Sequence, residues 1–137
     1  MDKSEKLVVL DRDGVINFDS EDYIKTANEW LPIPGSLEAI AALTAAAFVV
    51  VVVSNQSGIG RGLFTEDELL SINRKMLQAV ENTGGVISRI YHCPHHPDEN
   101  CNCRKPKPGM LQNLASDFGI ALTSVPVIGD KTSDLEM

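Results

Sequence analysis

The chemistry of this chain is concentrated in carboxylates that follow two short apolar runs. Asp11 and Asp13 come directly after residues 7–10, and Asp130 follows residues 125–128 with one glycine between. Such apolar runs predict buried strands, and open α/β sheets place their ligand sites at the carboxyl ends of strands. Carboxylates gathered there bind hard cations and, together with a cation, act on phosphate groups.

The first pair of carboxylates is spaced for joint work. In an extended segment residues i and i+2 project to the same side, so we expect Asp11 and Asp13 to face one pocket while Arg12 points away. One carboxylate can then attack while the other transfers a proton. The alternative is a solvated turn that ends the strand, because short Asp-rich strings are common in turns.

Hydrogen-bond donors follow a second apolar run, the valine-rich residues 49–53. This run is followed by Ser54, Asn55, Gln56 and Ser57. Their hydroxyl, amide and backbone N–H groups suit phosphoryl oxygens. Arg61, in the glycine-rich continuation, is a candidate anion contact, and a solvated surface arginine is the alternative. A dinucleotide fingerprint is excluded, because its third glycine would fall at Leu63.

A basic turn and a second acidic turn complete the candidates. Arg104 and Lys105 lie in a proline-rich turn before an expected helix, where a stiffened basic segment suits phosphate binding. An exposed charge run is the alternative for this segment. Asp130 is placed to complete a Mg²⁺ site with Asp11, since Mg²⁺ takes one or two carboxylates with water and phosphate. Asp134, four residues after Asp130, is a second acid at this turn, and the alternative is that it only stabilises the N-terminus of a helix.

Three cysteines and a histidine precede the basic turn. They are Cys93, His95, Cys101 and Cys103. Three thiolates and an imidazole can close a tetrahedral Zn²⁺ site with no open position, which predicts a structural ion rather than a catalytic one. The alternative is that these cysteines hold no metal. His92 and His96 are rival ligands, although we expect them to be ordinary packing or surface histidines.

Strands alternate with helices along the chain, which predicts an α/β fold with a doubly wound parallel sheet. The strands are expected at residues 6–10, 48–53, 88–92 and 125–128, and the helices at residues 36–46, 65–82 and 109–118. The helix at 65–82 is the best defined, because Thr65 and Glu68 form a capping box and Gly84 follows its end. The junction between residues 46 and 48 lacks the usual glycine.

Composition sets the broad class of the protein. Its 137 residues suit a single domain spanning 1–137, and its net charge of −7 argues against a nucleic-acid partner. No basic segment followed by an apolar core opens the chain, so we expect a reducing cytoplasm and no disulfide framework. The apolar stretch 39–53 is shorter than the ~20 residues of a membrane-spanning helix, so no membrane partner is expected.

The chain ends soon after Asp130, before a helix that would cover the last strand. We therefore expect a domain truncated after its fourth motif, with a carboxyl-terminal part missing. A monomer is expected, with association possible if the uncovered face is buried against another molecule.

Taken in order, four motifs of the chain resemble the haloacid dehalogenase superfamily of phosphohydrolases. The motifs are Asp11-Arg12-Asp13-Gly14, Ser54-Asn55, Lys105 before a helix, and Gly129-Asp130 with Asp134. The resemblance covers nearly the whole chain and implies a Rossmann-like fold.

The resemblance also implies a mechanism. Asp11 would be the nucleophile that forms an aspartyl-phosphate, and Asp13 the acid that protonates the leaving oxygen and later the base that activates water. Ser54 and Lys105 would bind the phosphoryl oxygens. Mg²⁺ would be held by the Asp11 carboxylate, the Asp13 backbone carbonyl and Asp130.

Within the superfamily, the cysteine-rich loop before Arg104 resembles the branch of heptose bisphosphate phosphatases and histidinol-phosphate phosphatases. This branch implies a capless enzyme whose loops grip a phosphorylated small molecule. It places substrate contacts after the first motif, at Asp19 and Asp22, and further along at Arg104 and Lys131. Asn55, Gln56, Ser57 and Arg61 form the loop that would complete them.

Two substrates of this branch are weighed against each other. The loop containing Ser57 and Arg61 favours the heptose bisphosphate, because an arginine there suits a second phosphate. The shortness of the loop between His95 and Cys101 favours histidinol phosphate. We rank first the hydrolysis of the heptose C7 phosphate, in the precursor pathway for lipopolysaccharide or S-layer glycan. A catalytically silent zinc-binding module is a third hypothesis.

Overall fold

The computed structural model describes residues 7–20, 23–56, 58–95, 101, 105, 109–119 and 126–129. Their strands are β1 (Leu7–Leu10), β2 (Val49–Asn55), β3 (Ile87–Cys93) and β4 (Val127–Ile128). Their helices are the 3₁₀ helix η2 (Ala27–Glu29) and the α-helices α1 (Ser36–Ala45), α2 (Glu66–Asn82) and α3 (Gly109–Phe118). The strands pair in parallel in the order β3-β2-β1-β4, which confirms the predicted α/β sheet.

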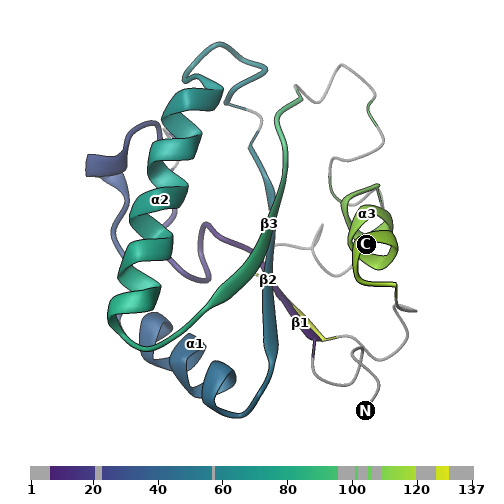
Figure 1. The fold of residues 1–137 in the computed structure, drawn as a ribbon. Helices are drawn as coiled ribbons and strands as arrows, with labels where there is room; N and C mark the ends of the chain where they lie inside the picture. The colour runs from purple at the N-terminus through teal and green to yellow at the C-terminus, as the bar shows by residue number, and fades with distance from the viewer. Residues whose placement is uncertain are drawn as a thin grey trace.

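Helices cover both faces of this sheet, with α1 and α2 on one side and α3 on the other (Figure 1). Alternate residues of a strand point to opposite faces, and β1 follows this rule. Val8 and Leu10 pack with the α1 and α2 side, whereas Leu7 and Val9 pack with the α3 side. Both faces of β1 are therefore buried, which explains why its sequence is uniformly apolar.

The strand order creates a switch point beside β1. The chain runs outward from β1 to β2 and β3, and then returns to place β4 on the other side of β1. Asp11 N donates to Ile128 O at 2.9 Å, so β4 ends next to the carboxyl end of β1. Ligands of open α/β sheets bind at such switch points, which directs attention to the residues that follow β1.

Local chemistry accounts for the boundaries of the two helices that precede β2 and β3. The predicted capping box of α2 is present, with the Thr65 hydroxyl accepting from Glu68 N at 3.1 Å and the Glu68 carboxylate accepting from Thr65 N at 2.9 Å. After α1, Ala47 takes the left-handed conformation that a glycine usually supplies, with φ of 66°. The junction without glycine is thus a strained turn.

The long segment between β1 and α1 is held down at several points. Trp30 is buried against the core, and the Lys75 ammonium donates to the carbonyls of Ala27 and Trp30 at 2.7 Å each. The Ser36 hydroxyl donates to Ile16 O at 2.7 Å. The 3₁₀ helix in this segment is an element that the sequence did not predict. Its attachment to α2 keeps the residues after Asp13 in place beside the sheet.

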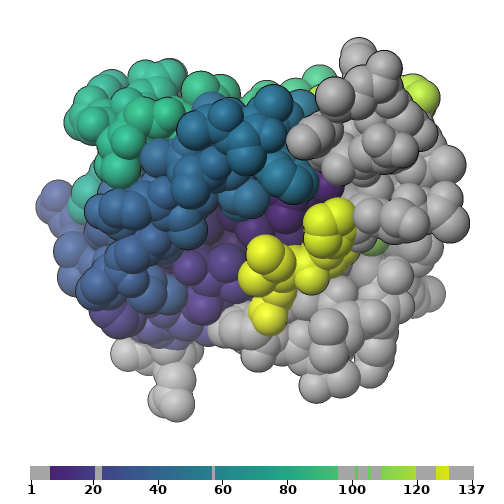
Figure 2. All heavy atoms as spheres, turned by 90° about the horizontal axis from the view of Figure 1, so that it is seen from below, coloured from purple at the N-terminus to yellow at the C-terminus, as the bar shows by residue number. Residues whose placement is uncertain are grey.

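The side of the molecule near β4 is partly open. Figure 2 shows β4 in yellow at the surface, next to the purple residues that follow the N-terminus. An apolar hollow on this side is lined by residues of β1, α1 and β4 and by the turn after β1, including Leu10, Val15, Ile40 and Ile128. Across the described segments, no helix combines the length and apolar character that crossing a bilayer requires.

Candidate active site at the carboxyl end of the sheet

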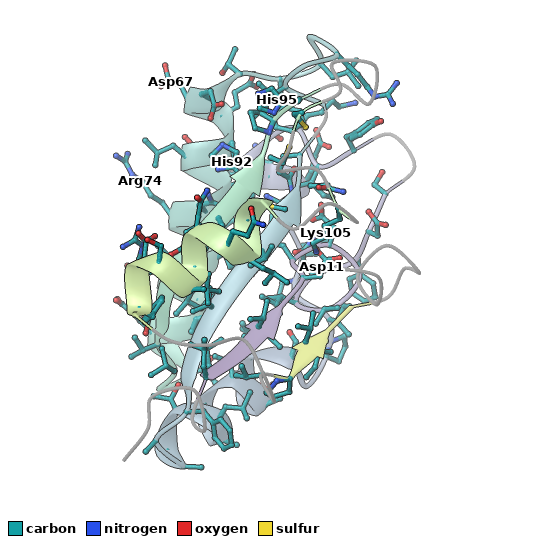
Figure 3. All side chains as sticks on the ribbon, turned by 90° about the vertical axis from the view of Figure 1, so that its right-hand side faces the viewer. Asp11, Asp67, Arg74, His92, His95 and Lys105 are labelled. Carbon is teal, nitrogen blue, oxygen red and sulfur yellow. The ribbon has the colours of Figure 1, made fainter. Side chains whose placement is uncertain are left out.

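Asp11 lies where the sequence predicts it, immediately after β1 at the switch point. The residue is 8% exposed, and its Oδ1 accepts from Arg12 N at 2.8 Å. The Lys105 ammonium lies 3.4 Å from the same oxygen and is also buried (Figure 3). An ionised carboxylate is the form that acts as a nucleophile, and the ammonium beside Asp11 attracts its negative charge.

A side chain at the end of β2 binds the backbone of Lys105, whereas Asp11 follows β1. Asn55, the last residue of β2, accepts from Lys105 N through its Oδ1 at 2.9 Å. Fifty residues of chain separate these two partners. The predicted strand at 48–53 in fact continues through Ser54 and Asn55, so both polar residues are fixed by the sheet rather than carried on a loop. The sheet thereby brings the second and third motifs to Asp11.

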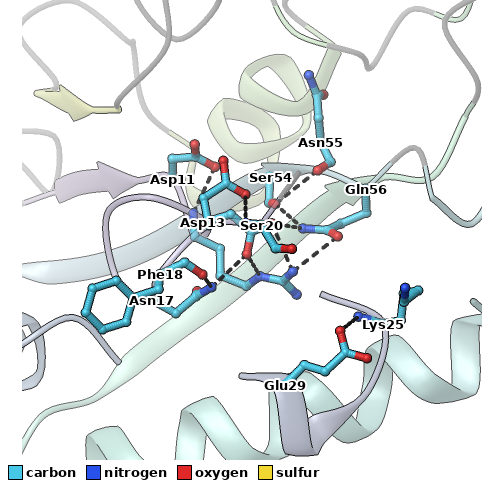
Figure 4. Close-up of polar contacts among 12 residues, drawn as sticks. Asp11, Asp13, Asn17, Phe18, Ser20, Lys25, Glu29, Ser54, Asn55 and Gln56 are labelled. Carbon is cyan, nitrogen blue, oxygen red and sulfur yellow. Dashed lines mark hydrogen bonds and ion pairs between the residues drawn. The ribbon is translucent and has the colours of Figure 1, made fainter. Parts of the chain in front are cut away.

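Asp13 lies in a dense network of donors (Figure 4). Arg12 Nε donates to Asp13 Oδ1 at 2.8 Å and Arg12 Nη2 donates to Oδ2 at 3.0 Å. The amides of Asn17 and Gln56 add hydrogen bonds of 2.9 Å and 3.3 Å to the same carboxylate. Burial alone would raise the pKa of Asp13, but the Arg12 charge and these hydrogen bonds outweigh it and hold the pKa below its ordinary value.

Ser54 joins this network from β2. Its hydroxyl oxygen accepts from Gln56 Nε2 at 2.6 Å, and its hydroxyl donates to Asn55 O at 3.4 Å. The side chain is buried at the carboxyl end of the sheet. A hydroxyl held in this way can turn its proton toward a phosphoryl oxygen without reorganising the strand.

A second group of side chains gathers where β3 ends. The ligand atoms of Cys93, His95 and Cys101 all lie within 4.8 Å of one another. Cys93 Sγ is 3.4 Å from His95 Nδ1 and 3.5 Å from Cys101 Sγ. These three residues could hold a metal ion, as the spacing of the sequence predicts. Cys103, the fourth predicted ligand, lies outside the described residues.

Comparison of the sequence with known proteins shows which family the chain belongs to. Residues 6–132 match the family described as Polynucleotide kinase 3 phosphatase. The chain is 49% identical over 133 residues to the D-glycero-beta-D-manno-heptose-1,7-bisphosphate 7-phosphatase of Pseudomonas aeruginosa, covering 97% of this chain and 75% of that relative. The corresponding enzyme of Pseudomonas putida is 51% identical over 131 residues, covering 96% and 75%.

A solved structure agrees with these relatives. The crystal structure of D,D-heptose 1,7-bisphosphate phosphatase from Bordetella bronchiseptica, complexed with magnesium and phosphate, has a TM-score of 0.94 to this chain at 49% identity. The match covers 96% of this chain and 73% of that structure. This chain belongs to the heptose bisphosphate phosphatase family.

More distant structures agree on the superfamily. A putative haloacid dehalogenase-like phosphatase from Mesorhizobium loti has a TM-score of 0.87 at 34% identity, covering 95% of this chain and 65% of that one. A hydrolase of the same superfamily from Geobacter sulfurreducens shares 17% identity with a TM-score of 0.56, which is a likeness of fold alone. The predicted resemblance to the haloacid dehalogenase superfamily is confirmed.

Two further predicted substrate contacts of this heptose phosphatase family member, Asp19 and Arg61, lie at the surface. Asp19 is exposed, and its carboxylate accepts from the neighbouring Ser20 N at 2.8 Å. Arg61 is exposed on the turn after β2, which is joined to the end of β3 by a 2.8 Å hydrogen bond from Gly60 N to Pro94 O. The predicted residues outside the described part of the chain are Asp22, Ser57, Arg104, Asp130 and Lys131.

One functional side chain departs from the sequence prediction. Arg12 was expected to point away from Asp13, and that expectation is wrong, since its guanidinium grips Asp13 and is 1% exposed. The alternation rule fails here because β1 ends at Leu10 and the chain turns around the Arg12 carbonyl, which accepts from Val15 N and Ile16 N. An arginine beside two aspartates at the end of a buried strand was the available clue, because buried arginines need charge partners.

Proposed function

We propose that this protein is a magnesium-dependent phosphatase that removes the C7 phosphate of D-glycero-D-manno-heptose 1,7-bisphosphate through an aspartyl-phosphate intermediate. The observation that carries the proposal is the buried Asp11–Lys105 pair at the switch point of a chain about half identical to enzymes named for this reaction. Such a phosphatase is a phosphoric monoester hydrolase.

Asp11 is proposed as the nucleophile. Its carboxylate attacks phosphorus while the bond from phosphorus to the C7 oxygen breaks. Lys105 and Ser54 would each bind a phosphoryl oxygen, because both lie buried at the same end of the sheet as Asp11. Both donors are in place before charge develops, so they stabilise the transition state with little reorganisation.

Asp13 is proposed as the acid and base. It would protonate the C7 oxygen as that oxygen leaves, and would later take a proton from the water that hydrolyses the aspartyl-phosphate. Its lowered pKa means that the free enzyme holds Asp13 ionised. The negative charge of a bound phosphate opposes this effect and favours protonation, which couples substrate binding to the acid role.

A hard cation fits the oxygen donors at this edge. The Asp11 carboxylate, the Asp13 backbone carbonyl and Asp130 would hold Mg²⁺, and Asp130 follows β4 by two residues in the sequence. When bound, the ion neutralises charge between the carboxylate and the phosphate. The relative solved with magnesium and phosphate supports magnesium as the ion.

Zinc is proposed as a structural ion at the end of β3. A tetrahedral Zn²⁺ with Zn–S bonds of about 2.3 Å places its sulfur ligands about 3.8 Å apart. The 3.5 Å separation of the Cys93 and Cys101 sulfurs is close to that edge. Cys93, His95, Cys101 and Cys103 would form the closed site, and the ion would connect β3 to the segment that carries Lys105.

The substrate would be gripped by loops rather than by a cap domain. Asp19, Asp22, Arg61, Arg104 and Lys131 are proposed contacts of the sugar and its second phosphate. Asn55, Gln56 and Ser57 would contribute from the end of β2. The proposed setting is a cytoplasmic monomer in lipopolysaccharide precursor synthesis, with neither nucleic acid nor membrane as a partner.

The deciding experiment compares substrates on the same preparation. Phosphate release would be measured from the heptose 1,7-bisphosphate and from histidinol phosphate, with product analysis to show which heptose phosphate is lost. We expect a higher kcat/KM for the heptose bisphosphate and loss of the C7 phosphate. A higher value on histidinol phosphate would reverse the assignment. A cooperatively folded protein with no activity on either substrate, or on other sugar phosphates, would support the silent zinc-binding module.

A further inference from the structure

We propose that Arg12 and Gln56 are positioning residues that hold the Asp13 carboxylate in the orientation from which it protonates the leaving oxygen. This inference rests on the proposed function, because the orientation of Asp13 matters only if Asp13 is the acid. Neither side chain needs to touch the substrate for this role.

The first support is the fork that Arg12 makes with Asp13. Two nitrogens of one guanidinium donate to two oxygens of one carboxylate, at 2.8 Å and 3.0 Å. Such a bidentate pair fixes the plane of the carboxylate as well as its distance, which a single point charge does not. Rotation of Asp13 about its side-chain bonds would break both contacts at once.

Gln56 closes a ring with these two residues. Its Oε1 accepts from Arg12 Nη2 at 3.2 Å, while its Nε2 donates to Asp13 Oδ2 at 3.3 Å (Figure 4). The same Nε2 donates to Ser54 Oγ at 2.6 Å. The ring therefore ties the proposed acid to the proposed phosphate-binding hydroxyl.

The backbone anchors this ring on the sheet. Gln56 N donates to Cys93 O at 2.8 Å, so Gln56 is held at the ends of β2 and β3 together. On the other side, Asn17 Nδ2 donates to Asp13 Oδ1 at 2.9 Å and to Phe18 O at 3.0 Å. Asp13 is thus held from two sides, by Gln56 at the ends of β2 and β3 and by Asn17 in the turn after β1.

The burial of Arg12 argues for a geometric role. The residue is 1% exposed, and its Nη1 is buried with no hydrogen-bond partner among the described residues. A buried ion pair adds little net stability relative to apolar side chains, and an unsatisfied buried nitrogen lowers the gain further. What the pair supplies beyond an apolar contact is the fixed direction of the Asp13 carboxylate.

The chemical step shows where this direction matters. As Asp11 attacks phosphorus and the bond to the leaving oxygen breaks, the Asp13 proton passes to that oxygen and a neutral alcohol departs. The alkoxide of an alkyl phosphate is strongly basic, so it leaves readily only when it receives this proton. The p-nitrophenolate of p-nitrophenyl phosphate is weakly basic and leaves without it. Misplacing the acid should therefore slow hydrolysis of an alkyl phosphate much more than hydrolysis of p-nitrophenyl phosphate.

The test compares Arg12→Met and Gln56→Met with the wild type. The quantity measured is kcat/KM, because it reports the steps up to departure of the leaving group. We expect Arg12→Met to lose about 10²-fold on the heptose bisphosphate and on glycerol phosphate, within the range of general acid catalysis, and only a few-fold on p-nitrophenyl phosphate. Gln56→Met should show the same selectivity with a smaller loss. Arg74→Met, on the exposed face of α2, is the matched control and should change neither substrate.

Two further variants separate positioning from folding. Arg12→Lys keeps the charge but cannot make the fork, so it should keep the selective loss. On an Asp13→Asn background, Arg12→Met should produce no additional loss, since the acid it positions is absent. Equal losses on alkyl and aryl phosphates, full rescue by lysine, or an additive loss on Asp13→Asn would each overturn the proposal.

The proposed function fails separately. A wild type that hydrolyses glycerol phosphate and p-nitrophenyl phosphate but not the heptose bisphosphate would refute the substrate assignment. The selectivity of Arg12→Met on the other two substrates would then still decide the positioning role. A wild type inactive on all three would refute both.

Discussion

Two groups of polar side chains lie along the carboxyl edge of the sheet, and their electrostatics differ. The group around Asp13 contains its own counter-charge in Arg12 and additional donors in Asn17 and Gln56. The group at the end of β3 consists of Cys93, His95 and Cys101, whose sulfur and nitrogen atoms are in contact. In the proposed zinc site these atoms would be the ligands, and the bound cation would neutralise the charge of thiolates held this close.

This difference between the two groups indicates which of them would depend on a bound ion for its structure. The Asp13 group is held together by protein donors, so the cation proposed beside it would serve chemistry rather than folding. In the cysteine group the proposed Zn²⁺ would bring the ligands together, so metal binding there would contribute folding free energy. Changes in the first group should therefore lower activity, and changes in the second should lower stability.

The largest effect is expected at the nucleophile. Asp11→Asn preserves the shape of the side chain but removes the charge that attacks phosphorus, so kcat should fall by roughly 10⁴-fold or more. Phosphate release under saturating substrate measures this, with denaturation curves to show that folding is retained. Asp67→Asn, in the exposed first turn of α2, is the matched control. Retained turnover in Asp11→Asn would exclude the covalent mechanism. It would also remove the functional distinction between the two groups of polar side chains.

Changes in the group of Cys93, His95 and Cys101 should lower stability more than activity. His95→Gln removes one ligand, so bound zinc should fall and the free energy of unfolding should decrease by about 3 kcal/mol, with kcat of the folded fraction retained. His92→Gln is the control, because His92 pairs with Glu66 at the surface at 3.1 Å and such pairs contribute about 1 kcal/mol or less. Metal analysis and urea denaturation of both variants decide this. Equal destabilisation by the two variants would contradict a metal site at His95.

Loss of the hydrogen bond that holds Lys105 beside Asp11 should have an intermediate effect. Asn55→Ala removes the acceptor for Lys105 N, so the ammonium beside Asp11 should be less well placed and kcat/KM should fall about 10-fold. Asn82→Ala, at the exposed end of α2, controls for loss of an asparagine. Steady-state kinetics at several substrate concentrations provides the measurement. An unchanged kcat/KM would mean that this hydrogen bond does not position Lys105.

The smallest effect is expected where a polar contact belongs to neither group. The Tyr91 hydroxyl on β3 donates to Asp117 at 2.6 Å, and burial together with this hydrogen bond raises the pKa of Tyr91 from 10.0 to about 12. Because the folded-state pKa is the higher one, this contribution is complete below pH 10 and is lost as the pH rises from 10 toward 12. Tyr91→Phe should therefore be less stable than the wild type at pH 8 by about 1 kcal/mol or less, and the difference should vanish near pH 12. A pH-independent difference would assign the effect to packing.

Much of the site could be predicted because its residues are tied to strand ends. An apolar strand followed by Asp11, or by Ser54, places each side chain at the same edge whatever the rest of the fold does. The helix boundaries were equally accessible where local chemistry sets them, as with Thr65 and Glu68. At Ala47 the sequence offered no such marker, because the residue in the left-handed turn is an alanine and not a glycine.

The interior of the acid network was beyond local rules. The direction of Arg12 depends on a turn that continues through Gly14, with φ of 86°, and on a partner 44 residues away in Gln56. No pattern within the first motif contains that partner. The same holds for Lys105, whose backbone is bound by a residue of β2.

By itself, the sequence determined the parallel α/β fold, the family resemblance and the residue types of both polar groups, because strand patterns and motif spacing are local properties of the chain. The tertiary structure alone decided that Arg12 turns inward to grip Asp13 and that Asn55 holds Lys105 beside Asp11. Lys105 and Asn55 are 50 residues apart, and Gln56, which completes the network of Arg12 and Asp13, is 44 residues from Arg12. These distant contacts form only when the sheet brings the ends of its strands together and excludes water from the charges between them.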